Sequence, residues 1–407
     1  MESAIQWAAN EMKKWPGEKS STAVFAAQEI AKVRQFHASI PSYTPTPLRS
    51  LRHLAAALGL GGIYVKDESY RFGLNAFKVL GGSYAMAQYL TRKVGKRLEA
   101  MTFAQLISRD MREKLGDLTF ATTTDGNHGR GVAWTAKMLQ QKAVVYMPKG
   151  SSAQRLENIR AEGATAYITE LNYDEAVRMT ADKAKQNGWI VVQDTAWEGY
   201  EEIPGWIMQG YGTMAAEALE QLHDLHVSAP THVFMQAGVG SVAGAVQGYL
   251  AATLPECLPR TVVVEASQAA CLYRSVRLGD GKPHAVGGAM NTIMAGLACG
   301  EPNIGAWEML RDYSDFFFSC PDWVAAKGMR TLGNPLAEDK RIISGESGAA
   351  PLGLLATLMQ ATDLAAAKAA LGLNEQSHVL LFSTEGDTDP EQYRRIVWDG
   401  EYPSYEK

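Results

Sequence analysis

The chain has 407 residues, of which 46% are hydrophobic and 20% are charged, and its formal net charge is −5. This length is too great for one ordinary core and predicts about two domains of a large globular protein. The mildly acidic balance, without a dense run of Lys or Arg, argues against a nucleic-acid or membrane partner. Since we find neither a leader-peptide pattern nor a stretch long and apolar enough to cross a bilayer, we expect a cytoplasmic protein.

The chain contains four widely separated cysteines, Cys257, Cys271, Cys299 and Cys320. None belongs to a CxxC pair, so the sequence predicts no zinc site, and it predicts no other metal. We expect reduced, partly buried thiols, although two of them could meet in space.

The first predicted helix spans Thr22 to Phe36, where apolar residues recur on one face and Ser21 is available as the cap. The proline-rich run 41–48 then favours extended chain.

Further along, strand-like runs alternate with helix-like runs. The predicted strands are 118–122, 143–147, 166–169, 189–193, 232–236, 261–265 and 378–383, and the helices between the first four are 130–139, 153–162 and 173–186. This alternation predicts right-handed βαβ crossovers and an α/β fold with mainly parallel sheets flanked by helices.

One lysine lies where lysines are uncommon. The buried strand-like run Ile63 to Val65 is followed by a polar loop, and a helix is predicted to begin near Ala76, which places Lys78 in its first turn. The positive end of the helix dipole and the apolar neighbours both lower the pKa of an amine there. A partly deprotonated lysine can attack a carbonyl and form a Schiff base. The alternative is an ordinary lysine that keeps its ammonium group at the surface.

A second stretch, Thr122 to Gly131, joins a predicted strand to a predicted helix. Backbone N–H groups at such a junction suit a carboxylate, and small side chains allow it to approach closely. Asp125, Gly126 and Asn127 are also common turn and cap residues, so a simple βα turn is the alternative.

A third stretch, Gln236 to Gly244, runs from a strand through a glycine-rich turn into an apolar helix. Its N–H groups and the helix N-terminus can hold a phosphate. Gly238, Gly240 and Ala243 also fit the dinucleotide pattern G-x-G-x-x-G/A, with Glu265 about 20 residues further on for a ribose hydroxyl. An NAD-dependent dehydrogenase is therefore an alternative.

These stretches together resemble the fold type II enzymes that depend on pyridoxal 5'-phosphate (PLP), the class of the serine and threonine dehydratases. Ser69 to Gly82 is similar to the segment that carries the Schiff-base lysine, here Lys78, and Asp67 to Lys78 more narrowly resembles diaminopropionate ammonia-lyase. The resemblance covers most of the chain. It implies two domains, each with a mainly parallel twisted sheet: a larger cofactor-binding domain, 1–84 plus 205–407, and a smaller α/β domain, 85–204. A homodimer is a further expectation from this class.

The resemblance also implies where the cofactor binds. Asn127, in the Gly-Asn-His-Gly loop, is expected to hydrogen-bond the phenolic oxygen of PLP. The phosphate is expected on five consecutive residues, Gly238, Val239, Gly240, Ser241 and Val242. A hydroxyl at the end of the last predicted strand is expected to face the pyridine nitrogen, with Ser383 as the first choice and Thr384 as the second. A neutral hydroxyl does not enforce protonation of the pyridine, which suits elimination of a good leaving group.

Acidic residues distinguish this chain within the class. The asparagine loop is expected to bind the substrate through Thr123, Thr124 and Asp125. Many dehydratases have a small residue where this chain has Asp125, and this carboxylate is the best argument for the diaminopropionate branch. Asp125 is expected to act as a second base or to bind a substrate ammonium group. Asp194 is expected to hold the β-amino group or to accept a proton, and Glu346 resembles a residue beside the cofactor.

The predicted reaction is the PLP-dependent α,β-elimination of 2,3-diaminopropionate to pyruvate and ammonia. Because Lys78 and Asp125 would act as bases on opposite faces of the substrate, both the D and the L form are expected to react. A serine or threonine dehydratase is the alternative within the class, and the NAD-dependent dehydrogenase is the alternative outside it. A PLP-binding protein without turnover is a third alternative.

Overall fold

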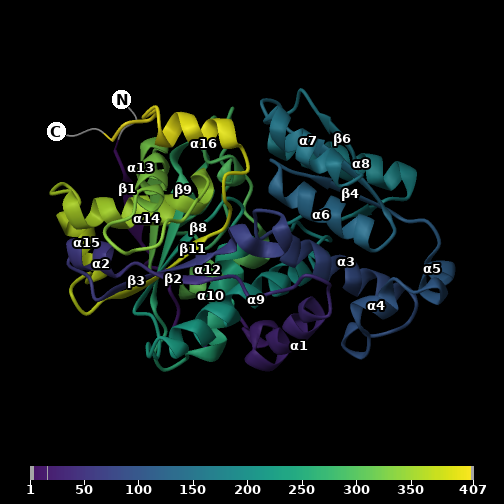
Figure 1. Ribbon diagram of the computed structural model, residues 1–407, viewed down its shortest axis with the longest axis horizontal. Coiled ribbons are helices and arrows are strands. Elements are labelled where there is room, and N and C mark those ends of the chain that lie inside the picture. The colour runs from purple at the N-terminus through teal and green to yellow at the C-terminus, as the bar shows by residue number, and fades with distance from the viewer. Residues whose placement is uncertain (1–3, 16, 405–407) are drawn as a thin grey trace.

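The computed structural model describes residues 4–15 and 17–404, which fold into two β-sheets surrounded by helices (Figure 1). The strands are β1 (Gln6–Ala9), β2 (Leu48–Ser50), β3 (Gly62–Asp67), β4 (Thr119–Thr123), β5 (Lys142–Met147), β6 (Thr165–Ile168), β7 (Ile190–Val191), β8 (His232–Gln236), β9 (Arg260–Ala266), β10 (Phe316–Cys320) and β11 (His378–Ser383). The larger sheet has the order β1-β10-β9-β8-β11-β3-β2, and the smaller sheet has the order β6-β5-β4-β7. The only antiparallel pairs in these sheets are β1 with β10 and β2 with β3. The predicted α/β fold with mainly parallel sheets is therefore confirmed.

The helices pack on both faces of the sheets. They are α1 (Ala27–Ala38), α2 (Arg52–Ala57), α3 (Val79–Lys93), α4 (Phe103–Leu106), α5 (Arg109–Leu115), α6 (Asn127–Met138), α7 (Ala153–Ala161), α8 (Tyr173–Asn187), α9 (Glu202–Asp224), α10 (Ser241–Thr253), α11 (Cys271–Leu278), α12 (Ile304–Tyr313), α13 (Asp322–Gly333), α14 (Glu346–Gln360), α15 (Ala365–Leu371) and α16 (Pro390–Val397). No helix in the described ranges combines the length and the apolar character needed to span a bilayer.

Each of the seven predicted strands overlaps an observed strand, and the three predicted crossover helices overlap α6, α7 and α8. The first helix was predicted to begin too early. A 3-10 turn occupies Ala23–Phe25, and α1 begins at Ala27 with Ala26 as its N-cap, so Ser21 does not cap it. β10 was not predicted, although its sequence is the apolar run Phe316–Cys320.

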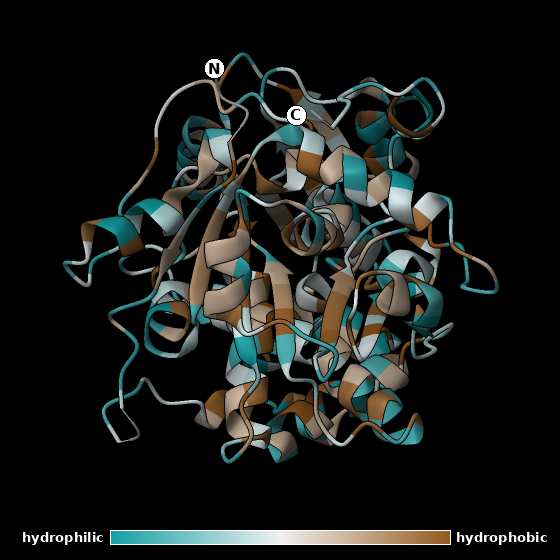
Figure 2. Ribbon diagram, turned by 90° about the vertical axis from the view of Figure 1, so that its left-hand side faces the viewer, coloured by the Kyte–Doolittle hydropathy of each residue, from teal (hydrophilic) through white to brown (hydrophobic). Residues whose placement is uncertain are grey.

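The central strands of the larger sheet are buried on both faces, as expected for a parallel sheet covered by helices. Val233 and Met235 of β8 belong to one apolar core, whereas Phe234 between them belongs to the other. Since successive strand residues point to opposite faces, the two cores lie on opposite sides of the sheet. Figure 2 shows hydrophobic colours along the central strands and hydrophilic colours on many of the outer loops.

A buried network of charges fixes the segment that precedes Lys78. Arg71 Nη2 lies 2.8 Å from both Glu68 Oε1 and Glu217 Oε2, and Lys66 Nζ lies 2.7 Å from Glu217 Oε2. All four side chains are at most 1% exposed. The two cations balance the two carboxylates, as the burial of charges requires. The network joins β3 and the following 3-10 turn to α9.

α3 and α9 approach each other closely beside this network. A methyl group on Gly210 of α9 would lie 2.4 Å from the carbonyl oxygen of Leu80, so a glycine is required at this crossing. His37 of α1 contacts both helices, through Thr213 Oγ1 at 2.8 Å and the carbonyl oxygen of Leu80 at 3.0 Å. The backbone that follows Lys78 is therefore held from two sides.

The predicted domain boundaries, near residues 84 and 205, both fall inside helices of the structure, in α3 and in the first turn of α9. The strands of the smaller sheet come from residues 119–191, and those of the larger sheet come from the segments before and after them. The division into 1–84 plus 205–407 and 85–204 remains a prediction.

Candidate active site

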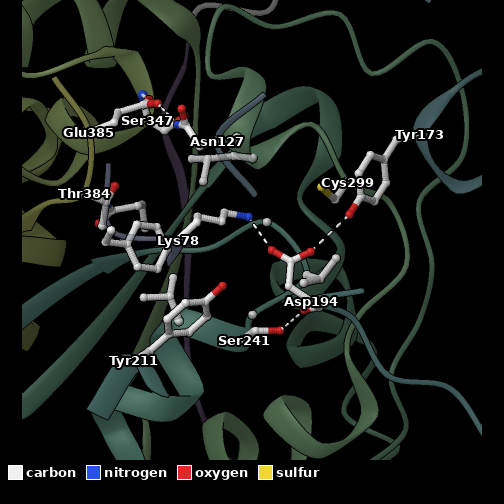
Figure 3. Close-up of a pocket in the computed structure, with 18 residues that line it drawn as sticks. Lys78, Asn127, Tyr173, Asp194, Tyr211, Ser241, Cys299, Ser347, Thr384 and Glu385 are labelled. Atoms are coloured by element: carbon white, nitrogen blue, oxygen red, sulfur yellow. Dashed lines mark hydrogen bonds and ion pairs between the residues drawn. The ribbon is translucent and has the colours of Figure 1, made fainter. Parts of the chain in front are cut away.

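A pocket lies where the carboxyl ends of strands from both sheets meet (Figure 3). This is the usual position of a ligand site in parallel α/β structures. Its lining includes nine of the predicted site residues, Lys78, Asn127, Asp194, Gly238, Val239, Gly240, Ser241, Val242 and Thr384. The structure thus brings together residues that are far apart in the sequence.

Lys78 and Asp194 face each other across the pocket. α3 begins at Val79, three residues later than the predicted start near Ala76, so Lys78 is its N-cap rather than a residue of its first turn, and Lys78 Nζ lies 2.5 Å from Asp194 Oδ2. Burial by itself would lower the pKa of Lys78, but the charge of Asp194 raises this pKa above its ordinary value. The predicted lowering of the lysine pKa is therefore wrong for this arrangement, because the sequence did not reveal that the Asp194 carboxylate pairs directly with Lys78.

Asp194 is held by several groups besides Lys78. Burial by itself would raise its pKa, but the neighbouring His128 and Lys78 lower the pKa of Asp194 to about 2. His128 Nδ1 lies 3.9 Å from Asp194 Oδ2, and burial lowers the pKa of His128 itself, so Lys78 is the cation of this cluster at neutral pH. The hydroxyl of Tyr173 donates to Asp194 Oδ1 at 3.5 Å. Asp194 is therefore a fixed, ionised carboxylate.

The glycine-rich loop between β8 and α10 forms another wall of the pocket. Gly240 has φ +99°, a backbone conformation that favours glycine, and it is the N-cap of α10 without a side chain that caps the helix. The first N–H groups of α10 therefore have no side-chain acceptor from the cap and can bind an anion. The hydroxyl of Ser241 donates to the carbonyl oxygen of Asp194, and Asn303 Nδ2 donates to Ser241 Oγ at 2.8 Å.

The pocket also contains polar groups that have no partner. Gln236 Oε1 and the hydroxyls of Tyr211 and Ser347 are buried without a hydrogen-bond partner, and all three residues line the pocket. Figure 3 shows the Tyr211 hydroxyl pointing into the pocket. Because buried polar groups are normally paired, these atoms indicate a polar ligand. With a lysine and an anion-binding loop in the same pocket, the residues fit a phosphorylated aldehyde such as PLP.

Asp125 lies beside this pocket rather than in its wall. It lines an adjoining cavity of about 580 Å³, together with Arg155 and Glu346. Asp125 Oδ2 is buried without a hydrogen bond and lies 3.9 Å from Arg155 Nη1, while Glu346 Oε2 lies 3.6 Å from Arg155 Nη2. Burial, only partly offset by Arg155, raises the pKa of Glu346 to about 7. Asp125 is close enough for its charge to contribute to the raised pKa of Lys78, and its role as a base remains a prediction.

The two threonines before Asp125 have structural roles. The Thr123 hydroxyl is buried against α8, where it pairs with Thr180 Oγ1 at 2.7 Å and with the carbonyl oxygen of Ala176 at 3.1 Å. Thr124 Oγ1 accepts from the N–H groups of Gly126 at 2.8 Å and Gly129 at 3.0 Å. Neither hydroxyl is directed to the pocket, and the binding of a substrate carboxylate by this loop remains a prediction.

The two hydroxyls at the end of β11, Ser383 and Thr384, have different surroundings. The Ser383 hydroxyl donates to Ser344 Oγ at 2.8 Å, and Ser383 does not line the pocket, so the geometry does not support the first choice of Ser383. Thr384 lines the pocket, and its Oγ1 accepts from Gln236 Nε2 at 2.6 Å. The proton of the Thr384 hydroxyl is therefore available to a ligand.

Sequence reasoning missed several residues that line the pocket, namely Tyr173, Tyr211, Cys299, Ser347 and Glu385. Glu385 directly follows Thr384 and could have been proposed from that position alone. Tyr173, Tyr211 and Cys299 lie in segments without a local motif, whereas Ser347 directly follows Glu346, which the sequence did single out. Cys271 and Cys299 are buried, free thiols. In the described part of the chain, no group of three or more His, Cys, Asp or Glu side chains is placed to hold a metal ion.

The alternative of an NAD-dependent dehydrogenase required Glu265 to bind a ribose hydroxyl. Glu265 is instead fully buried, and its carboxylate accepts from the N–H groups of Leu272 at 2.8 Å and Tyr273 at 2.6 Å, which start α11. Burial raises the pKa of Glu265 to about 8. This carboxylate has a structural role, and the geometry does not support the dehydrogenase.

Comparisons with known proteins agree with the site. A family model described as pyridoxal-phosphate dependent enzyme matches residues 40–374. The chain therefore belongs to the pyridoxal-phosphate dependent enzymes. It is 51% identical to diaminopropionate ammonia-lyase of Salmonella typhimurium over 401 residues, which cover 98% of this chain and 99% of the relative. Within the class, this similarity shows that the chain belongs to the diaminopropionate ammonia-lyase family, as its sequence motifs predicted.

Solved structures give the same result. The crystal structure of diaminopropionate ammonia-lyase from Escherichia coli in complex with D-serine matches with a TM-score of 0.92 and 49% identity, covering 99% of both chains. A second structure of the E. coli enzyme, in complex with an aminoacrylate-PLP azomethine reaction intermediate, matches with a TM-score of 0.90, 49% identity and the same coverage. The predicted cofactor class and fold type are confirmed.

Proposed function

We propose that this chain catalyses the PLP-dependent α,β-elimination of 2,3-diaminopropionate to pyruvate and ammonia, with both the D and the L form as substrates. The family and the relatives named above support the reaction. The structural observation that carries the proposal is the partly buried ion pair of Lys78 and Asp194, 2.5 Å apart, beside the glycine-rich loop. A reactive lysine, an anion-binding loop and a fixed carboxylate are the groups that this chemistry requires.

The pocket offers a partner for each part of the cofactor. Lys78 is the residue that would bind PLP covalently, and the loop Gly238 to Val242 would hold the phosphate. The free proton of the Thr384 hydroxyl would face the pyridine nitrogen, and Asn127 would donate to the phenolic oxygen. When bound, PLP supplies an electron sink that stabilises negative charge at the α-carbon of an amino acid.

The chain itself supplies the proton acceptors and the site for the leaving group. Lys78, once neutral, can accept the α-proton on one face of the substrate, and Asp125 can accept it on the other face. Asp194 is an ionised carboxylate in the pocket, so it can hold the β-ammonium group by charge. Since a β-ammonium group departs as neutral ammonia, no additional general acid is needed at that step.

The first experiment is reduction of the purified protein with borohydride, followed by mass spectrometry of its peptides. We expect a pyridoxyl group on Lys78. Protein produced with ample PLP that carries no such group would contradict the proposal. Rates with D- and L-diaminopropionate, serine and threonine would then identify the substrate. If serine gave pyruvate much more efficiently than either isomer of diaminopropionate, the chain would be a serine dehydratase.

Two finer expectations accompany this function. We propose a homodimer in the cytoplasm, which rests on the resemblance to the enzyme class and on the sequence. Light scattering coupled to size-exclusion chromatography would measure the mass against the 44.2 kDa of one chain. Fractionation of cells, with detection of the protein by antibody, would measure its location.

A further inference from the structure

Glu385 is a carboxylate in the pocket wall that the proposed reaction does not use. It directly follows Thr384 and is 2% exposed. A buried carboxylate normally needs hydrogen-bond donors, so its partners indicate what holds it there. Figure 3 shows Glu385 beside Ser347 and Asn127, at the side of the pocket opposite Tyr211.

Both oxygens of Glu385 are engaged. Oε2 accepts from Asn127 Nδ2 at 2.5 Å, and Oε1 accepts from the N–H of Ser347 at 3.1 Å. These two donors belong to the first turns of α6 and α14. An ionised carboxylate only accepts hydrogen bonds, so it selects the amide nitrogen of Asn127 and excludes the flipped orientation, in which two oxygens would face each other.

The backbone around Glu385 is fixed to the segment of Lys78. The N–H of Phe77 donates to the carbonyl oxygen of Thr384, and the N–H of Gly386 donates to that of Asn75, each at 3.0 Å. On its other side, the N–H of Gly345 donates to the carbonyl oxygen of Glu385 at 3.0 Å. The carboxylate is therefore presented to Asn127 from a backbone that cannot shift without moving Lys78.

We infer that Glu385 is a positioning residue that sets the orientation of the Asn127 amide for the cofactor. Glu385 accepts from one N–H of the Asn127 amide. The second N–H of this amide is left to donate into the pocket, and the amide oxygen does not face Glu385. A charge-assisted hydrogen bond fixes this orientation before a ligand arrives. The inference rests on the proposed contact between Asn127 and the phenolic oxygen of PLP.

A double-mutant cycle tests whether Glu385 acts through Asn127. The variants are Glu385→Gln, Asn127→Ala and the two combined, each prepared as full-length apoprotein and titrated with PLP. The readouts are the dissociation constant of PLP and the visible absorption band of the bound cofactor, neither of which requires turnover. We expect Glu385→Gln to weaken PLP binding by about 10- to 100-fold, the range for loss of a hydrogen bond to a charged group, and to shift the band. In the Asn127→Ala background the same change should have no further effect beyond about two-fold.

A matched control separates positioning from stability. Glu265 is also a fully buried carboxylate that accepts two N–H groups at the start of a helix, but it does not line the pocket. Glu265→Gln should lower the melting temperature and leave the PLP constant and the band unchanged. If Glu385→Gln does not fold, Glu385→Asp can replace it in the double-mutant cycle. Aspartate keeps the negative charge, but its side chain is one methylene shorter and so places the carboxylate further from Asn127.

The outcomes are distinct. Equal losses of PLP affinity from Glu385→Gln in the wild-type and Asn127→Ala backgrounds would overturn the inference, since Glu385 would then act independently of Asn127. An unchanged band and PLP constant, with only a lower melting temperature, would also overturn it and leave Glu385 with a structural role. Wild-type PLP binding by Asn127→Ala would overturn the proposed cofactor contact itself, and with it this inference.

Discussion

Lys78 and Asp194 form a partly buried ion pair that joins the start of α3 to the segment after β7, with Nζ and Oδ2 2.5 Å apart. The lysine that would bind the cofactor is therefore a cation in the protein without cofactor. Since only a neutral amine attacks an aldehyde, this lysine must lose a proton when the cofactor binds. Asp194 thus opposes the first covalent step and then remains as a charged group beside the substrate.

Replacement of Asp194 by Asn is expected to change the rate at which apoprotein takes up PLP. Because Asp194 raises the pKa of Lys78, its loss lowers that pKa and increases the neutral fraction of the amine at pH 7. PLP uptake, followed by absorbance in a stopped-flow instrument, should be faster in Asp194→Asn than in the wild type at pH 7. A slower uptake at every pH would show that the pair does not limit this step.

The same pair predicts how stability depends on pH. The pKa of Asp194 lies at about 2 in the folded protein and near 3.8 in the unfolded chain. Ionised Asp194 therefore stabilises the folded state above about pH 4, and this stabilisation is lost as the pH falls toward 2. Because the pKa of Lys78 is raised, the stabilisation from its positive charge is lost only at a pH above its ordinary pKa of 10.5. Apo Asp194→Asn should be about 2–5 kcal/mol less stable than the wild type at pH 7, and the difference should shrink below pH 4. Urea unfolding measures it, and Asp110→Asn, at an exposed ion pair with Lys114, should show no such difference.

Asp125→Asn is expected to slow the reaction of one enantiomer of diaminopropionate far more than that of the other. The form whose α-proton faces Asp125 should lose about 10²- to 10⁴-fold in kcat, because a general base is removed, while the other form should be nearly unaffected. Pyruvate release with each pure enantiomer measures this, with Asp182→Asn on the exposed face of α8 as the control. Unchanged rates for both enantiomers would remove Asp125 from the mechanism.

Gly240→Ala is expected to weaken PLP binding. A methyl group there would lie 3.2 Å from Leu310 Cδ1, and φ of +99° is unfavourable for alanine by about 1–2 kcal/mol. Both effects would move the N–H groups of the loop Gly238 to Val242, which is proposed to hold the phosphate. Gly281→Ala has a similar φ of +81° and open space around it, so it tests backbone strain alone. Equal PLP affinity in both variants would argue against phosphate binding at this loop.

Arg71→Met is expected to destabilise the fold severely. It leaves Glu68 and Glu217 buried without their guanidinium partner, which typically costs about 3–5 kcal/mol. Thermal unfolding should show a fall of several degrees. Arg109→Met, at an ion pair whose arginine side chain is 93% exposed, should change the stability by less than about 1 kcal/mol. A small effect of Arg71→Met on stability would mean that water or a local shift of the structure takes the place of the guanidinium beside Glu68 and Glu217.

The local pattern of the sequence was sufficient for most of the strands and for the glycine-rich loop whose backbone lines the pocket, but not for β10 or for the start of α1. The loop Gly238 to Val242 could be predicted because a strand, a glycine-rich turn and a helix define an anion site without distant partners. Thr123 and Ser383 were expected at the site, but their hydroxyls are paired outside the pocket, for a shared reason. In a strand, a shift of one residue turns a side chain to the opposite face, and sequence alone does not fix that register. Glu385 could have been proposed from its position after Thr384, but its pairing with Asn127, 258 positions away, could not.

The central position of β11 has a consequence for the synthesis of the protein. This strand lies between β8 and β3, so without it the larger sheet is divided into β1-β10-β9-β8 and β3-β2. The backbone of Phe77, next to Lys78, also has its partner in Thr384, just beyond β11. A nascent chain on the ribosome therefore lacks a complete PLP pocket until residues 378–385 have emerged, even though Lys78 was made some 300 residues earlier. Cofactor capture in the cell must follow the joining of these two half-sheets, and a protein shortened before β11 would carry the reactive lysine without a site to use it.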